Sequence, residues 1–248
     1  YSNTEGYMPL RQFISDRYKK QGVDFAPENI IITNGSQQAL DMVAATLINP
    51  GDTVAVEKPS YLAALQTFHL YDPKIVSVSL NDDGIDCDEL EKILKENDPK
   101  FIYVIPNFQN PTGLTYTQAV RERAAEILKA AGTPVIEDNP YGELRFHGEG
   151  GSSFATLLGE QCAAMGTFSK IVAPGMRIGW IACKQPELYA KCAHILLPKD
   201  YVRYMLTGEY ATEVSDASGM QLMDVANRCW SDEVLAALDI DKSMLAKV

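Results

Sequence analysis

The sequence has little histidine, no paired cysteine motif and no long apolar run. Its three histidines lie far apart without the spacing of metal ligands, so we predict no metal site. The five cysteines are odd in number and none forms a Cys-x-x-Cys pair, which argues against a disulfide framework or a zinc site. No stretch approaches the roughly 18 to 20 apolar residues that span a membrane, and no secretion signal opens the chain.

Positive charge is also in short supply. The 248 residues include 22 lysines and arginines against 33 aspartates and glutamates, which gives a formal net charge of −11. A nucleic-acid partner normally requires a basic face, so this balance argues against one. Hydrophobic residues make up 46% of the chain, enough to bury a core. We therefore expect a globular protein with no nucleic-acid or membrane partner, and a cytoplasmic location by default.

Short β-branched or apolar runs alternate with segments of helical period. The runs are Ile30–Thr33, Thr53–Val56, Ile75–Leu80, Phe101–Ile105, Pro134–Glu137, Ala163–Thr167 and Ile178–Cys183. This alternation predicts a three-layer α/β/α fold with a mostly parallel, seven-stranded sheet. Asp86 with Glu89 three residues on resembles a capping box at a helix start. Other helices are expected at Pro9–Lys20, Ser36–Ile48, Tyr61–Leu70 and Gln118–Ala131.

The alternation stops near Ala193, which we interpret as a domain boundary between residues 1–192 and 193–248. Beyond it the sequence predicts a mainly helical segment. Its helices are expected at Lys199–Leu206 and Ser231–Leu238, on either side of a polar turn at Ser215–Gly219.

Polar residues follow the predicted strands, where ligands bind in a doubly wound sheet. After the first strand, Ser36 and Gln37 open a helix whose free N–H groups favour a phosphate, although Gly-Ser is also an ordinary turn. Tyr61 follows the second strand and is placed either to stack on a planar ring or to pack in the core. Asn110 precedes Pro111, so its backbone is extended and its amide is free to donate.

The fifth and sixth runs are followed by acidic, hydroxyl and basic side chains. Asp138 stands at a strand end, where it serves either as a helix cap or as the carboxylate that keeps a pyridine nitrogen protonated. Thr167, Ser169, Lys170 and Arg177 fall within eleven residues and together suit phosphate binding and imine formation. A lone lysine in a loop is usually only solvated, so the order of the whole set carries the argument.

In this order, Asn110-Pro111-x-Gly113, Asp138-x-x-Tyr141 and Ser169-Lys170 with Arg177 resemble the class I aminotransferases of pyridoxal-phosphate fold type I. The resemblance covers about residues 1–192 and is strongest to the 2-aminoadipate, kynurenine and multi-substrate branch. It implies pyridoxal 5′-phosphate (PLP) as the cofactor. It also implies that Lys170 is the Schiff-base lysine and that Asp138 is the partner of the pyridine nitrogen.

The resemblance implies further roles. Asn110 and Tyr141 would bond the ring oxygen of PLP, and Tyr61 would stack on the ring. Tyr1 would reach the neighbouring subunit's site in a homodimer. The activity implied is amino-group transfer between an amino acid and a 2-oxo acid, with Lys170 moving the α-proton. The residues implied around the phosphate are Ser36, Gln37, Thr167, Ser169 and Arg177.

Residues from about His194 resemble a different family, the xylulokinase branch of the FGGY carbohydrate kinases. The similarity runs through Leu197–Tyr204, Leu206–Tyr210 and Ser215–Gly219. This piece brings no recognisable phosphate loop, so we expect no sugar kinase activity. The expectation is an aminotransferase large domain that is truncated at both ends and incomplete for turnover, joined to a kinase fragment by natural fusion or by an assembly artefact.

Three alternatives stay open. The first is another fold type I reaction, such as that of a lyase or a decarboxylase, because these enzymes share the cofactor-binding residues. The second is a non-catalytic PLP-binding module, such as the effector domain of a transcription regulator. The third is a chain that neither binds PLP nor folds fully, because its truncated domains leave apolar surface exposed.

Overall fold

The computed structural model describes residues 4–184, 206–209, 211–212, 222–237 and 242–248. The chain divides into two compact units, residues 1–185 and 186–248, each of which is described by itself. The expected boundary near Ala193 and most of the expected helix Lys199–Leu206 lie outside the described residues. The division into residues 1–192 and a kinase-like 193–248 therefore stays a prediction.

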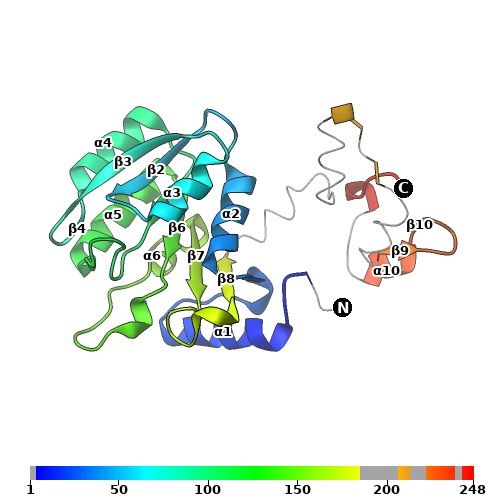
Figure 1. Ribbon diagram of the computed structural model, residues 1–248, viewed down its shortest axis with the longest axis horizontal. Helices are drawn as coiled ribbons and strands as arrows, with labels where there is room; N and C mark the ends of the chain where they lie inside the picture. The colour runs from blue at the N-terminus through cyan, green and yellow to red at the C-terminus, as the bar shows by residue number, and fades with distance from the viewer. Residues whose placement is uncertain (1–3, 185–205, 210, 213–221, 238–241) are drawn as a thin grey trace. The chain divides into compact units, whose positions relative to one another are not determined.

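The first unit is built on an eight-stranded sheet with the order β1-β8-β7-β6-β5-β2-β3-β4 (Figure 1). The pairs β3–β2, β2–β5, β5–β6 and β6–β7 are parallel, as expected of a mostly parallel sheet. The strand β8 runs antiparallel to both β7 and β1. The strands are β1 (Ile30–Thr33), β2 (Thr53–Lys58), β3 (Lys74–Asn81), β4 (Gly84–Ile85), β5 (Ile102–Val104), β6 (Val135–Asp138), β7 (Cys162–Thr167) and β8 (Gly179–Cys183).

The expectation of seven strands was wrong by one. The extra strand, β4, forms a tight hairpin with β3 in which Asn81 pairs with Gly84. Gly84 has a φ of +142°, and a Cβ at this position would lie 2.7 Å from a methyl carbon of Val120. A two-residue strand is too short to show a hydrophobic period, so the sequence pattern does not reveal it.

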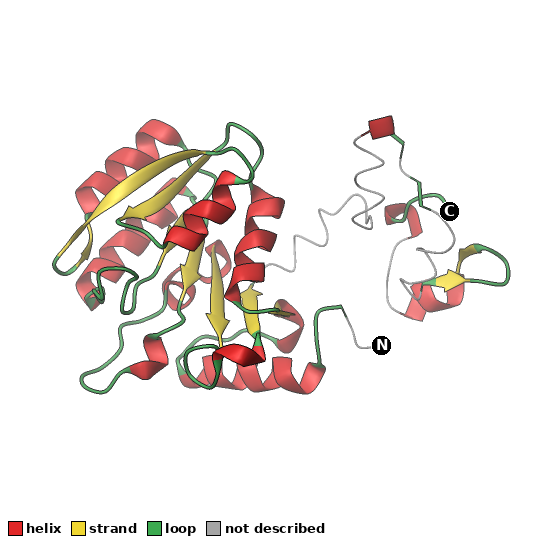
Figure 2. Cartoon of the chain, viewed as in Figure 1, coloured by secondary structure: helices red, strands yellow, loops and turns green. Residues whose placement is uncertain are grey.

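Helices cover both faces of the sheet, which gives the expected three layers (Figure 2). Residues of α1, α4, α5 and α6 share one apolar core, in which Leu90 and Ala124 are fully buried. Leu40 of α2 and Phe68 of α3 belong to a second core. The helices are α1 (Met8–Lys20), α2 (Ser36–Leu47), α3 (Leu62–His69), α4 (Cys87–Asn97), α5 (Gln118–Ala131) and α6 (Phe154–Leu158), with short 3₁₀ turns η1 (Pro27–Asn29), η2 (Gly142–Leu144), η3 (Gly159–Gln161) and η4 (Pro174–Met176).

The start of α4 is capped, but not by a full capping box. The Asp86 carboxylate accepts hydrogen bonds from the backbone N–H groups of Asp88 and Glu89, both at 3.0 Å. The Glu89 carboxylate does not return to Asp86. It accepts instead from the backbone N–H of Ser79, at 2.7 Å, and so ties the helix to β3. The expected hydrogen bond from the backbone N–H of Asp86 to the Glu89 carboxylate was therefore wrong, because that carboxylate binds the backbone N–H of Ser79 instead.

Arg121 of α5 is fully buried and holds together the loops near the carboxyl ends of β5 and β6. Its guanidinium donates to the carbonyl oxygens of Tyr116 at 3.0 Å, Pro106 at 2.8 Å and Ser152 at 3.1 Å. It also donates to the side-chain oxygen of Asn107, at 2.8 Å. A buried charge is tolerated only when it is hydrogen-bonded, and these four acceptors meet that need. The Pro106 carbonyl oxygen also accepts from the backbone N–H of Tyr116, so the other three acceptors depend most on Arg121.

The described part of the second unit is a short hairpin with a helix. Trp230 is buried in a small core and its ring N–H donates to the carbonyl oxygen of Ala246, at 2.8 Å. The expected helix Ser231–Leu238 corresponds to α10, and Asp224 accepts from the backbone N–H of Asn227 in the hairpin turn. The elements are β9 (Met223–Asp224), β10 (Cys229–Trp230), α10 (Asp232–Ala237) and η5 (Lys242–Met244).

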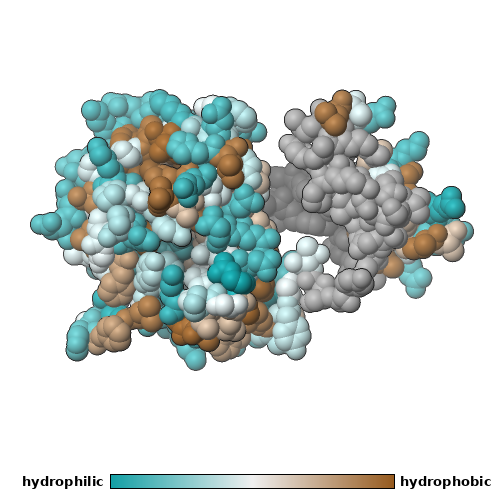
Figure 3. All heavy atoms as spheres, viewed as in Figure 1, coloured by the Kyte–Doolittle hydropathy of each residue, from teal (hydrophilic) through white to brown (hydrophobic). Residues whose placement is uncertain are grey.

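Hydrophilic residues cover most of the face of the first unit that Figure 3 shows, with smaller hydrophobic patches between them. Among the residues that the structure describes, no helix has both the length and the apolar character needed to cross a membrane.

Replacing Arg121 is expected to destabilise the first unit strongly. In Arg121→Met, the Tyr116 carbonyl, the Ser152 carbonyl and the Asn107 side-chain oxygen lose this donor and Pro106 loses one of two, so the free energy of unfolding should fall by about 3 kcal/mol. Arg123→Met is the matched control, since Arg123 lies on the same helix but forms an exposed ion pair with Asp88, worth under about 1 kcal/mol. Urea unfolding followed by circular dichroism compares the two. Equal losses in both variants would contradict the role given to Arg121.

Candidate active site

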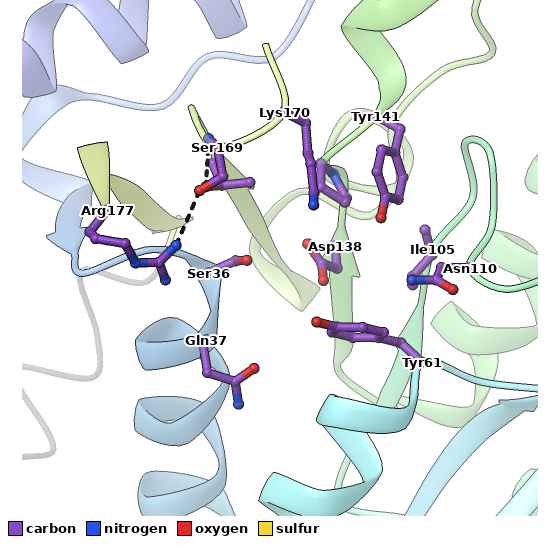
Figure 4. A pocket seen from close by; sticks show the side chains of 12 residues that line it. Ser36, Gln37, Tyr61, Ile105, Asn110, Asp138, Tyr141, Ser169, Lys170 and Arg177 are labelled. Atoms are coloured by element: carbon purple, nitrogen blue, oxygen red, sulfur yellow. Dashed lines mark hydrogen bonds between the residues drawn. The ribbon is translucent and has the colours of Figure 1, made fainter. Parts of the chain in front are cut away.

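A cavity of about 460 Å³ lies at the carboxyl ends of the central strands. All ten predicted site residues within the described part of the chain line it, and Figure 4 shows their side chains around one space. Tyr1, the remaining predicted residue, lies outside the described residues. Two lining residues, Ile105 and Pro140, were not predicted. The full lining is Ser36, Gln37, Tyr61, Ile105, Asn110, Asp138, Pro140, Tyr141, Thr167, Ser169, Lys170 and Arg177.

Asp138 ends β6 with its side chain almost fully buried, at 2% exposure. One carboxylate oxygen, Oδ2, accepts from the hydroxyl of Tyr103 at 2.8 Å. The other, Oδ1, is buried and has no hydrogen-bond partner among the described residues. Burial raises the pKa of Asp138 to about 6, with a further upward effect from Glu137, while the Tyr103 hydrogen bond opposes the rise. An unpaired buried acceptor of this kind suits the N–H of a ligand.

Four side chains surround the Asp138 carboxylate in Figure 4: Lys170, Tyr141, Tyr61 and Asn110. Lys170 lies in the turn after β7 and is exposed to solvent. Tyr61 caps the start of α3 and is half-buried, and burial, followed by the charge of Asp138, raises the pKa of its phenol. The site therefore combines a primary amine, two phenols and an amide around one buried carboxylate.

The opposite end of the cavity is formed where β8 begins. Gly179 pairs with Thr167 at the end of β7 and with Thr33 at the end of β1. A Cβ on Gly179 would lie 2.6 Å from the backbone nitrogen of Ser36, so only glycine allows this approach. The register therefore brings the N-terminus of α2 next to the turn after β7.

Hydroxyls and a guanidinium gather at this end of the cavity. The Thr167 hydroxyl lies 3.0 Å from that of Ser169, and Arg177 donates to the Ser169 hydroxyl at 3.5 Å. Gly35 has a φ of +78°, and a Cβ there would lie 2.4 Å from a terminal nitrogen of Arg177. The hydroxyls of Thr167 and Ser169, the Arg177 guanidinium and the free N–H groups at the start of α2 together suit an anion such as a phosphate. We call this end of the cavity the anion corner.

Gln37 differs from its neighbours because its side chain is hydrogen-bonded to another helix. Its side-chain amide donates to the hydroxyl of Thr67 in α3, at 2.6 Å, and so links the two helices beside the cavity. Its side chain still lines the cavity.

The residues behind the cavity wall were not predicted from the sequence. Tyr103, which donates to Asp138, stands inside a buried strand where a tyrosine is unremarkable. Glu57 is 1% exposed and accepts hydrogen bonds from Tyr116, Gln109 and the backbone of Ile105. An acidic residue directly after the apolar run Val54–Val56 was the available signal, because a charge in a buried strand needs partners.

Comparison with known proteins identifies a family. The family model of aminotransferase class I and II matches residues 1–237. The chain is 42% identical over 191 residues to aromatic-amino-acid aminotransferase 1 of Thermococcus litoralis, covering 74% of this chain and 46% of that protein. It is 34% identical over 242 residues to 2-aminoadipate transaminase of Thermus thermophilus, covering 96% of this chain and 59% of that protein.

Solved structures give the same result. A crystal structure of Pyrococcus horikoshii kynurenine aminotransferase, in complex with PMP, matches with a TM-score of 0.71 and 40% identity, over 77% of this chain and 48% of that one. The chain is also 36% identical over 179 residues to an uncharacterized HTH-type transcriptional regulator of Escherichia coli, covering 71% of this chain and 38% of that protein. The chain thus spans about half the length of the proteins it matches.

These matches bear on the expected boundary near Ala193. The family match continues to residue 237, and the similarity to the Thermus protein covers 96% of the chain. Neither supports the resemblance of residues 194–248 to xylulokinase.

The raised pKa of Asp138 predicts that the free energy of unfolding of the ligand-free protein depends on pH. The folded state holds the Asp138 proton up to about pH 6, whereas the unfolded state loses it near 3.8, so the folded state binds more protons between these values. The unfolding free energy of the wild type, relative to Asp138→Asn, should therefore fall as pH rises from about 4 to 6. The full change is on the order of 3 kcal/mol.

Urea unfolding of both proteins at intervals from pH 4 to 8 tests this. Tyr103→Phe removes the donor that lowers the pKa of Asp138, so the fall should extend above pH 6 in that variant. A wild-type curve parallel to that of Asp138→Asn across the range would show that Asp138 is ionised throughout.

Proposed function

Because the chain belongs to the aminotransferase class I and II family, we propose that its first unit binds PLP for amino-group transfer between an amino acid and a 2-oxo acid. The observation that carries the proposal is the placement of Asp138. Its unpaired, buried oxygen lies at one end of a cavity whose other end is an anion corner, with Lys170 on the wall. A planar ring with a protonated nitrogen and a phosphate matches this distribution of groups.

The residues present fit the cofactor. Asp138 Oδ1 would accept the hydrogen bond of the pyridine N–H, which satisfies the unpaired acceptor. Tyr61 would stack on the ring, and Asn110 and Tyr141 would bond its hydroxyl oxygen. The phosphate would be held by Ser36, Gln37, Thr167, Ser169 and Arg177. Gly35 lets the Arg177 guanidinium lie close to the chain, and Gly179 lets β8 approach the start of α2.

PLP supplies an electron-accepting ring that stabilises the negative charge left when a substrate amino acid loses its α-proton. Asp138 would keep the ring nitrogen protonated, and a cationic N–H beside it would in turn favour the ionised form of Asp138. The Lys170 amine would hold the cofactor through its aldehyde, and as a free amine it would be placed to take up and return a substrate proton. The Tyr141 hydroxyl would donate a hydrogen bond to the ring's hydroxyl oxygen.

The relatives support a proposal for the substrate class. The similar proteins include an aromatic-amino-acid aminotransferase, a 2-aminoadipate transaminase and a kynurenine aminotransferase. We propose a substrate in this range, with a large aromatic or acidic side chain. The apolar hollow lined by Phe108, Leu144 and Phe146 beside Asn110 and Tyr141 supports the aromatic part of this range.

A second candidate function is an effector domain that binds PLP without turnover. The similarity to a transcription regulator favours it, because the same cofactor residues would serve ligand sensing. A lyase or decarboxylase reaction shares these residues as well and is separated from transamination by its products.

The xylulokinase resemblance of residues 194–248, homodimerisation and a cytoplasmic location also stay proposals. The separate core of the second unit, around Trp230, is compatible with a segment of different origin. Amplifying the source DNA across residue 193 would test whether the two parts are joined in the native gene. A continuous native transcript would exclude an assembly artefact.

Lys170→Ala should abolish covalent capture of PLP. The wild type mixed with PLP is expected to show a visible absorbance band of the lysine adduct, and borohydride should fix one cofactor mass to the peptide containing Lys170. The control is Lys129→Ala, which removes an exposed lysine at the end of α5. A soluble wild type with no band, or a band that persists in Lys170→Ala, would contradict the proposed cofactor site.

The products of one half-reaction separate the candidate functions. Incubation of the PLP-loaded protein with kynurenine or 2-aminoadipate should yield the cofactor as pyridoxamine phosphate with one equivalent of 2-oxo acid. Release of ammonia or carbon dioxide would favour the lyase or decarboxylase. Binding of PLP without any product, in the parent protein as well as this chain, would favour the effector domain.

A further inference from the structure

Glu57 and Gln109 form a buried pair behind the cavity wall, and neither lines the 460 Å³ cavity. Both are 1% exposed, and the Gln109 amide donates to a carboxylate oxygen of Glu57 at 2.9 Å. The same amide group donates to the carbonyl oxygen of Pro59, at 2.8 Å. Pro59 lies two residues before Tyr61, and Gln109 directly precedes Asn110. One side chain thus connects the two loops that carry these cavity residues.

The pair is satisfied on every side. The second carboxylate oxygen of Glu57 accepts from the Tyr116 hydroxyl at 2.5 Å and from the backbone N–H of Ile105 at 3.0 Å. The Gln109 carbonyl oxygen accepts from both the backbone N–H and the hydroxyl of Thr112, at 3.0 and 2.7 Å. Neither side chain can turn without leaving a buried group unpaired, and this penalty fixes the arrangement.

Resting on the proposed function, we infer that Glu57 and Gln109 are positioning residues that set the separation of Tyr61 and Asn110, and with it the slot for the cofactor ring. Glu57 stands at the end of β2, whose loop carries Tyr61, and its acceptors reach both ends of the 105–116 loop that carries Asn110. Burial raises the pKa of Glu57 to about 7, and its three donors offset part of this effect. The carboxylate is thus kept in place at an energetic cost.

Two substitutions separate positioning from general stability. In Glu57→Gln, the new amide nitrogen opposes a donor in either orientation, the amide nitrogen of Gln109 or the backbone N–H of Ile105. The resulting shift weakens the connection between the two loops. In the double variant Glu57→Gln with Gln109→Glu, donor and acceptor are exchanged and the pair is restored, but the carbonyl of Pro59 has no donor. The double variant should therefore fix the 105–116 loop again while the Tyr61 loop stays loose.

Amide hydrogen exchange of the protein without cofactor measures each loop directly. The amides of Gln109, Gly113 and Tyr116 report on the Asn110 loop, and those of Ala64 and Leu65, which bond the Tyr61 carbonyl, report on the other. We expect about tenfold faster exchange in both sets for Glu57→Gln, and a return of only the first set to wild-type rates in the double variant.

The affinity for PLP is the second readout. It should fall about tenfold in Glu57→Gln and recover in part in the double variant. The control is Gln161→Met, because the Gln161 amide also bridges two carbonyl oxygens, of Leu128 and Thr133, but lies outside the cavity. Gln161→Met should lower stability without changing exchange in either loop or the affinity for PLP.

The outcomes separate this inference from the proposed function. A wild type that fails to bind PLP contradicts the proposed function, and exchange then still decides whether the pair positions the two loops. Unchanged exchange in both loops of Glu57→Gln, or unchanged PLP affinity where the wild type binds, overturns the inference. Equal effects of Glu57→Gln and Gln161→Met on the loops overturn it as well.

Discussion

The carboxylate of Asp138 is buried at the end of a central parallel strand, with one oxygen held by Tyr103 and the other unpaired among the described residues. Water does not solvate it, so the charged form is costly and the pKa rises to about 6. Strand order creates this environment, because β6 lies between β5 and β7 and Tyr103 comes from β5. A ligand that brings an N–H to Asp138 removes the cost, so binding and stability are coupled through one hydrogen bond.

Asp138 shares the interior with two other acids, Glu57 and Glu137, which are each 1% exposed. Their charges act on one another: Asp138 raises the pKa of Glu57, and Glu137 raises that of Asp138. The fully buried guanidinium of Arg121 is hydrogen-bonded to loop carbonyls and an amide rather than to any of these carboxylates, and its charge lowers the pKa of Glu137 alone among the three. This end of the sheet therefore favours a cationic group, and perturbed acids of this kind are typical of functional sites.

The sequence was sufficient to predict the cavity wall but not what lies behind it. Carboxyl ends of parallel strands converge, so Asp138, Thr167 and the residues after β5 can be placed together from strand assignment alone. The link between Glu57 and Gln109 depends on β2 lying next to β5, and the order of strands cannot be read from hydrophobic period. The two-residue strand β4 was not predicted, because it is too short to show a hydrophobic alternation.

The position of Lys170 follows from the reversal of the chain between β7 and β8. Because β8 runs antiparallel to β7, the turn between them must fold back over the carboxyl end of the sheet. Gly179 then meets the start of α2, which places Ser169 and Arg177 at the anion corner, while Thr167 continues the row of strand ends that includes Asp138. Lys170 lies directly after Ser169 and so faces the space between the corner and the carboxylate. A parallel β8 would require a long crossover instead, and the lysine would lose its place between the two ends of the cavity.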